Sequence, residues 1–283
     1  MIDFLVGPLS YGFMQRGLVA ALIVGIVCAV MGAFVVLKGL AFIGDAVSHA
    51  AFPGLVIAYL IGVPLYIGGA IAAVSTALAI GVVSRRGNLR FDTAVGVLFA
   101  GTFALGVLLF STIRGYVTDL FGYLLGNVLG ISEADLIQVG VLGAVVLVVV
   151  LVLRKELLYA TFDPAGAAAS GLPVTRLEYL LLAMLGVTIV VSIQAVGIIL
   201  VVAMLTTPAA TAQLVVTRFD RLVRVAVAIA VVSTIVGLYV SFYLNVASGA
   251  AIVLIETLLF GLALLLSPRS GLLASRRRVP AGG

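Results

Sequence analysis

Long apolar runs alternate with short polar segments along almost the whole chain. A helix that crosses a bilayer needs about 20 mainly apolar residues, and short polar segments are typical of the loops between such helices. The runs of this length are 17–37, 40–60, 64–83, 93–113, 134–153, 176–194, 195–216, 222–243 and 248–267. The pattern therefore predicts an all-α polytopic membrane protein with eight or nine transmembrane helices.

The composition argues against a soluble protein. Of the 283 residues, 64% are hydrophobic and 10% are charged, whereas soluble domains carry about 25% charged residues. The net charge of +5 and the sequence pI near 9.6 would suggest nucleic-acid binding in a soluble protein. Here the basic residues lie between the apolar runs. Their positions therefore indicate that they determine membrane topology, and we expect no nucleic-acid partner.

The basic residues also predict which side of the membrane each loop faces. With the N-terminus outside and nine crossings, 14 of the 16 Lys and Arg residues face the cytoplasm, and only Arg16 and Arg114 lie outside. Cytoplasmic loops of membrane proteins carry such an excess of Lys and Arg. We therefore expect a multi-pass protein with its N-terminus outside and its C-terminus in the cytoplasm.

Two segments do not fit a spanning helix. Residues 114–132 are apolar only from Leu120 to Ile131. That stretch is too short to cross the membrane, so we expect an interfacial or re-entrant helix. Residues 269–283 are basic and follow the last apolar run. We expect a disordered cytoplasmic tail there, after a transmembrane domain that comprises residues 1–268.

Asp45 and His49, the only histidine, lie four residues apart in the second apolar run. Side chains at i and i+4 share one face of a helix, and a carboxylate with an imidazole can bind a divalent transition metal. Because ionisable groups are costly in a bilayer, the pair predicts a metal site and favours metal transport. Ser48 is a weaker candidate beside it. Two ligands are too few to strip a hydrated ion, and two chains around a two-fold axis would supply four.

A separate short helix is predicted between the fifth and sixth runs. Asp163 is a good N-cap and Pro164 a good first helical residue, and the side chains of 165–170 are small. Gly171 can end the helix in a left-handed conformation, and Pro173 prevents its continuation. Such a helix is suited to close docking in a groove of another protein, although an ordinary interfacial loop also fits the spacing.

Further polar residues surround Pro208 in the seventh run and include Thr207. Proline-interrupted spans in both halves of a chain often mark a transport path, which makes Thr207 a pathway candidate. Threonine also satisfies backbone groups that a proline frees, and this explanation fits at least as well.

One stretch is specific, and it reads Gly39-Leu-Ala-Phe-Ile-Gly-Asp-Ala-Val-Ser-His-Ala-Ala-Phe-Pro-Gly54. Together with the short helix, it resembles the membrane permease of the zinc, manganese and iron family of bacterial ABC importers. Further matches, in family order across nearly the whole chain, are Phe13 to Arg16, Asp92 to Phe99, Leu120 to Gly122, Phe162 to Pro173 and Ala203 to Ala212.

The resemblance implies a homodimer in the bacterial cytoplasmic membrane. Each subunit would engage a cytoplasmic ATPase, and a solute-binding protein would deliver the metal from outside. Asp45 and His49 match the family's metal-contacting residues, and 163–171, with Asp163, Pro164 and Gly171, matches its coupling helix.

The cargo implied by the resemblance is manganese, zinc or iron, with no permanently bound cofactor. The sequence has no Gly-x-x-x-x-Gly-Lys-Ser/Thr loop, so the chain would be a transport subunit whose partner hydrolyses ATP. Glu256 departs from the family pattern, which has a small or apolar residue there. A contact with the metal path, a hydrogen bond to a hydroxyl and a protonated acid near a helix end all fit Glu256.

Three other functions stay open at this point. A permease for a metal chelate such as a siderophore is the nearest, but an acid–histidine pair suits a bare ion better. An ion-coupled secondary metal transporter usually has more intramembrane ionisable groups than Asp45, His49 and Glu256, and does not need the 163–171 helix. An intramembrane hydrolase would use His49 and Asp45 with Ser48, but adjacent positions point about 100° apart on a helix, which is poor geometry for a Ser–His pair.

Overall fold

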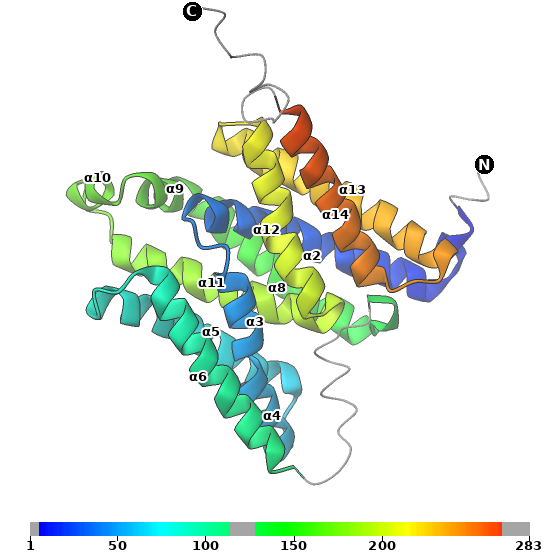
Figure 1. Cartoon of the computed structure of the whole chain (residues 1–283), viewed down its shortest axis with the longest axis horizontal. Coiled ribbons are helices and arrows are strands. Elements are labelled where there is room, and N and C mark those ends of the chain that lie inside the picture. The colour runs from blue at the N-terminus through cyan, green and yellow to red at the C-terminus, as the bar shows by residue number, and fades with distance from the viewer. Residues whose placement is uncertain (1–5, 114–127, 268–283) are drawn as a thin grey trace, which may run out of the picture.

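The computed structural model describes residues 6–113 and 128–267, and this part of the chain is a bundle of helices without strands (Figure 1). In chain order the elements are η1 (Pro8–Ser10), α2 (Gly12–Leu37), α3 (Ile43–Ala50), α4 (Phe52–Ile61), α5 (Leu65–Arg86), α6 (Phe91–Ser111), η2 (Val128–Gly130), α8 (Glu133–Val152), α9 (Arg154–Phe162), α10 (Pro164–Ala169), α11 (Val174–Val196), α12 (Ile198–Val215), α13 (Phe219–Leu244) and α14 (Ser248–Leu266).

The predicted all-α polytopic membrane fold is confirmed. Within the described ranges, 9 segments are helical, long and apolar enough to cross a membrane, and each lies within a few residues of its predicted bounds. The second of them, Ile43–Ile61, combines α3 and α4. Of the predicted interfacial helix, residues 114–127 lie outside the described part, as does the predicted tail, and Val128–Gly130 forms a 3-10 turn.

Helices α2 and α11 form the centre of the bundle. About 67% of the apolar core of each is buried, as is 72% for the α3–α4 span, compared with 17% in α6 and in α14. Helix α2 packs against α8, α11, α12 and α13. The outer helices expose apolar side chains, as helices in contact with lipid do.

Glycines allow two of the closest helix contacts. A side chain at Gly32 of α2 would overlap the main-chain oxygen of Leu205 in α12. Gly54 of α4 and Gly68 of α5 face each other in the same way, and a side chain on either would overlap the carbonyl of the other. Small residues at such crossings let membrane helices approach closely.

The second span is interrupted between α3 and α4. Pro53 lies in the first turn of α4, and a proline has no N–H to donate to the carbonyl four residues earlier, which belongs to His49. The helix therefore breaks one turn after the acid–histidine pair. The break separates an eight-residue helix that carries the pair from an apolar helix of ten residues.

Polar contacts tie the helix ends together at both ends of the bundle. At one end Glu178 of α11 binds Lys38, next to α2, and Arg85 of α5, while Arg154 of α9 pairs with Asp220 of α13. At the other end Arg16, Glu133, Asp135 and Gln194 link α2, α8 and α11. Each contact joins ends that the nine-crossing threading assigns to one side of the membrane.

The short helix after the fifth span has the predicted boundaries. The backbone N–H of Gly166 donates to Asp163 Oδ1 at 2.9 Å, and Pro164 is the first residue of α10. Gly171 has a φ of +82°, and the N–H of Leu172 reaches back to the carbonyl of Ala167 at 3.0 Å. Both ends of α10 are therefore fixed by local hydrogen bonds, as expected for a helix with an Asp cap and a glycine stop.

Candidate functional site

Helix α3 presents the acid–histidine pair on one face. His49 Nδ1 lies 3.0 Å from the main-chain oxygen of Asp45 and 3.4 Å from its Oδ1. The exposed fractions of the two side chains are 49% for Asp45 and 30% for His49, so an ion has access to both. The predicted sharing of one helix face is confirmed.

The hydrogen bond fixes which imidazole nitrogen is available. A main-chain carbonyl only accepts hydrogen bonds, so Nδ1 of His49 carries the proton in this contact. In the neutral ring, Nε2 then keeps its lone pair and is the nitrogen free to bind a metal. Metal-binding histidines are commonly oriented by a ring N–H that donates to a backbone carbonyl.

Two phenylalanines of α6 hold the imidazole in place. The rings of Phe99 and Phe103 meet His49 edge-on, with centroid distances of 5.5 and 5.6 Å. Phe103 also contacts Phe52 at the start of α4. The aromatic contacts limit the rotation of His49 and surround it with apolar atoms on that side.

Pro53 does not leave the His49 carbonyl without a partner. Pro53 cannot donate to it, but the main-chain oxygen of His49 accepts from the N–H of Ala51 at the end of α3. The interrupted segment therefore offers an imidazole nitrogen and a carboxylate about one turn apart. Nitrogen and oxygen donors of this kind suit manganese, iron or zinc.

The described part of one chain does not complete a metal site. Within residues 6–113 and 128–267, no group of three His, Cys, Asp or Glu side chains could hold a metal ion. Helix α3 packs against α5, α6, α11 and α12, whereas Glu256 lies on α14, which packs against α12 and α13. The structure therefore brings Asp45 and His49 together and leaves Glu256 in another part of the bundle.

Ser48 and Thr207 do not join the pair through any hydrogen bond in the described structure. Ser48 is buried, and its hydroxyl donates to the carbonyl of Gly44 at 2.7 Å. Thr207 is half-buried on α12, where its carbonyl accepts from Thr211 at 2.7 Å. Their roles near a metal path stay predictions.

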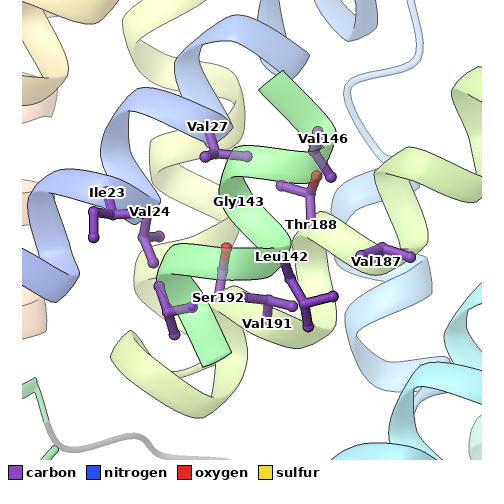
Figure 2. Close-up of a pocket in the computed structure, with 11 residues that line it drawn as sticks. Ile23, Val24, Val27, Leu142, Gly143, Val146, Val187, Thr188, Val191 and Ser192 are labelled. Carbon is purple, nitrogen blue, oxygen red and sulfur yellow. The ribbon is translucent and has the colours of Figure 1, made fainter. Parts of the chain in front are cut away.

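Two cavities in the described part of the bundle have mainly apolar linings. One lies between α2, α8 and α11 (Figure 2), has a volume of about 10 Å³ and is lined mainly by Val, Ile and Leu side chains with Thr188 and Ser192. That volume is room for about one water molecule. A wider cavity of about 350 Å³ runs beside α4 and has no ionisable residue in its lining.

The end of the bundle beside α10 forms a second polar region. Helix α10 exposes Ala165, Ala168 and Ala169, and Phe162 before it is 61% exposed. Glu178, one turn into α11, holds Arg85 at 3.0 Å and Lys38 at 3.8 Å. The short helix is therefore connected to the ends of α2 and α5 through the first turn of α11.

Comparison with known proteins identifies the family of this fold. The model of the ABC 3 transport family matches residues 10–267, which is most of the chain. The chain belongs to the ABC 3 transport family. The resemblance inferred from the sequence is therefore confirmed.

Named relatives of this ABC 3 family chain are transport proteins. It is 47% identical over 265 residues to a manganese transport system membrane protein, MntC, of Halalkalibacterium halodurans, with 94% of this chain and 91% of the relative covered. It is 43% identical over 260 residues to a chelated iron transport system membrane protein, YfeD, of Yersinia pestis, with 91% and 86% covered.

A solved structure of a similar protein has the same fold. PsaBC from Streptococcus pneumoniae in complex with Fab matches with a TM-score of 0.85 at 33% sequence identity. The match covers 98% of this chain and 100% of the other. The fold of this ABC 3 family chain therefore also occurs in a solved structure.

Sequence reasoning missed two sets of contacts. It did not identify Phe99 and Phe103 as neighbours of His49, although Asp92 to Phe99 was among the stretches that carried the resemblance. It also did not identify Glu178 as a common ion-pair partner of Lys38 and Arg85. Glu178 is the only acidic residue in the first turns of α11, and that isolation among basic neighbours was an available signal.

Proposed function

We propose that this chain is the membrane permease subunit of an ABC importer that moves a divalent transition metal ion into the cytoplasm. The observation that carries the proposal is the acid–histidine pair, with Nε2 of His49 free and the Asp45 carboxylate beside it on a partly exposed face. Family membership and the manganese and chelated iron named for relatives support the same class of cargo.

A bare ion fits this pair better than a chelate. The imidazole and the carboxylate bind a metal directly, whereas a chelator already fills most coordination positions of its metal. The aromatic rings of Phe99 and Phe103 also restrict the space beside His49. We therefore take manganese, iron or zinc as the substrate.

The complete binding site is proposed to form between two copies of the chain. One chain offers two side-chain ligands, and a two-fold axis beside α3 would bring four together. Asp45 and His49 are partly exposed in the single chain, as ligands shared with a partner would be. A solute-binding protein on the outer face would deliver the ion.

The basic end of the bundle is proposed to face the cytoplasm. Lys38, Arg85 and Arg154 gather there with α10, and basic residues are enriched on the cytoplasmic side of membrane proteins. This orientation leaves the first residue of α2 outside and the last residue of α14 inside. It also gives α10 access to a cytoplasmic ATPase.

Helix α10 is proposed as the contact with that ATPase. Its exposed side chains are small, so the surface of another protein can approach its backbone closely. Asp163 and Gly171 hold its ends, and Glu178 connects the following helix to α2 and α5. Movement of α10 would therefore reach helices that pack near α3.

The test measures metal accumulation in cells that lack their own uptake systems. The cells express this chain with its ATPase and binding protein, and elemental mass spectrometry reports manganese, iron and zinc. Wild type is compared with His49→Ala at equal membrane abundance. Ser75→Ala, an exposed serine of α5, is the matched control.

The proposal expects one or more of these metals to accumulate with wild type and with Ser75→Ala, and to fall to background with His49→Ala. No accumulation with wild type would contradict the substrate class. Equal accumulation with His49→Ala would leave import standing and remove His49 from the path.

A further inference from the structure

Glu256 is a fully buried acid within the last spanning helix. It lies one turn after Ile252 on α14, and its exposed fraction is 0%. Neither of its carboxylate oxygens has a hydrogen-bond partner among the described residues. A buried carboxyl without a partner is costly in a protein and more so in a membrane span, so the group calls for a ligand.

Ser233 of α13 lies opposite Glu256. A Cβ atom built on Gly237 would lie 2.6 Å from the Cα of Ile252, which marks the closest approach of α13 and α14. The two helices are joined by a short loop and run antiparallel. One turn back from Gly237 on α13 is Ser233, and one turn on from Ile252 is Glu256, so antiparallel packing puts these two positions opposite each other.

Two hydroxyl groups at this position are also unpartnered. Ser233 Oγ and Thr234 Oγ1 are buried, and neither has a hydrogen-bond partner in the described part of the chain. Thr234 points toward α2, because its Oγ1 lies 3.5 Å from a Cβ atom built on Gly25. One carboxyl and two hydroxyls thus share the interior between α2, α13 and α14.

Other hydroxyls in the bundle behave differently. They donate to the carbonyl four residues earlier, which is the usual way to satisfy a hydroxyl inside a membrane helix. The residues that do so include Ser48, Thr102, Thr188, Thr206, Thr211 and Thr257. Ser233 and Thr234 have the same option on α13 and do not use it, so their oxygens stay available to a ligand.

No cationic side chain reaches this cluster from the helices around it. Helix α12 has no charged residue, and α13 carries charges only in its first turns, from Asp220 to Arg224. Helix α2 carries Arg16, which pairs with Glu133 at the end of the bundle, and the buried thiol of Cys28, which lies near Glu256 and 3.6 Å from Ser192 Oγ. Ser192 lines the small crevice in Figure 2. Among the described residues, no cationic side chain would balance a negative charge on Glu256.

We propose that Glu256, Ser233 and Thr234 form a buried site for a monovalent hard cation, with sodium as the ion that fits best. Carboxylate and hydroxyl oxygens are ligands for hard cations, and oxygens around one such ion lie too far apart to hydrogen-bond to each other. A single carboxylate neutralises one positive charge. A divalent ion would leave an uncompensated charge in the bundle interior, which is unfavourable.

The cation site has a different role from the acid–histidine pair. It lies between α13 and α14, and α13 packs against the central helix α2, whereas the pair lies on α3 and is partly exposed. The cation would therefore stabilise the bundle and would not be the transported ion. Thermal stability in different salts separates the two sites.

The experiment uses the full-length permease with its ATPase in lipid nanodiscs and measures the midpoint of thermal unfolding. Sodium, potassium and choline chloride are compared at equal ionic strength. We expect sodium to raise the midpoint by about 3 °C or more over choline in wild type and in His49→Ala. In Glu256→Gln the difference between sodium and choline should vanish.

Two further variants keep the test decisive if Glu256→Gln does not fold. Ser233→Ala keeps the carboxyl and removes one ligand, so a higher sodium concentration should be needed for the same shift. Glu133→Gln removes an exposed carboxyl at the end of the bundle and should respond to sodium like wild type.

Two results would overturn the site. Equal midpoints in sodium and choline for wild type would mean that Glu256 is a buried neutral acid without a bound ion. A sodium response that persists unchanged in both Glu256→Gln and Ser233→Ala would locate the ion elsewhere.

Discussion

Helices α3 and α10 are both short and both have an aspartate and a proline nearby, but the two carboxylates have different partners. Asp163 precedes the first turn of α10, and its Oδ1 accepts the N–H of Gly166. Asp45 lies inside α3, where the N-cap is Phe42 without a side-chain hydrogen bond, and its carboxylate faces His49. One aspartate completes a helix, and the other belongs to the proposed metal site.

The prolines differ in the same way. Pro164 is the first residue of α10, where no helical hydrogen bond is lost. Pro53 follows α3 within one continuous span, so it breaks the helix beside the pair. The same two residue types therefore have different effects, depending on where they lie relative to the start of a helix. In α10 they close a short helix that is the proposed ATPase contact, and in α3 they belong to the proposed metal site.

The largest expected effect is on His49. His49→Ala should lower metal uptake at least about tenfold, because it removes the only imidazole of the chain. Co-purification of the ATPase should not change, since α10 is at another part of the bundle. Uptake assays and pull-down on the same membranes measure both. Loss of both properties together would mean that the two regions are not separable.

The same substitution at the two aspartates sharpens the comparison directly. Asp45→Asn removes the charge that faces the ion and should lower uptake about tenfold. Asp163→Asn should have a much smaller effect, because asparagine caps a helix about as well as aspartate. The measurement is initial uptake rate against metal concentration. Similar losses in both variants would contradict the division of roles.

A substitution at Gly171 tests helix α10, the proposed ATPase contact, without changing Asp45 or His49. Its φ of +82° disfavours a β-branched residue, so Gly171→Val should strain the end of α10 by about 1–2 kcal/mol. Uptake and ATPase co-purification should fall severalfold, while metal binding to the permease persists. Gly140→Val is the control, because Gly140 of α8 has open space around it. Full ATPase co-purification in Gly171→Val would argue against α10 as the contact.

The smallest expected effect concerns Glu178 of α11, whose ion pairs connect the helix after α10 to the ends of α2 and α5. Glu178→Gln removes ion pairs with Lys38 and Arg85 that are partly exposed, so the loss of stability should be about 1 kcal/mol or less. Thermal unfolding of the purified complex measures it. The control is Glu133→Gln, because the side chain of Glu133 is 81% exposed, and its stability should not change. A larger loss of stability in Glu133→Gln than in Glu178→Gln would contradict this prediction.

Local sequence signals were sufficient for part of this structure. The spans follow from apolar length, and α10 follows from Asp163, Pro164 and Gly171, because each signal acts within a few residues. The i,i+4 spacing also gave the shared face of Asp45 and His49. These features depend on helix geometry alone.

Contacts between distant segments were not available from the sequence. Phe99 and Phe103 reach His49 only because α6 packs on α3. The unpartnered state of Glu256 depends on what α2, α12 and α13 present to it. A single sequence shows a polar residue in an apolar run, but its partners come from helix packing, which has no local signal.

The central claim is that the transported ion contacts His49, and pulsed EPR of bound manganese tests it most directly. The full complex in nanodiscs, without nucleotide, is loaded with manganese, and nitrogen coupling to the ion is recorded. His49 is the only histidine of the permease, so we predict coupling from a directly bound imidazole nitrogen in wild type and its loss in His49→Ala. Unchanged nitrogen coupling in His49→Ala, or none in manganese-loaded wild type, would contradict the account.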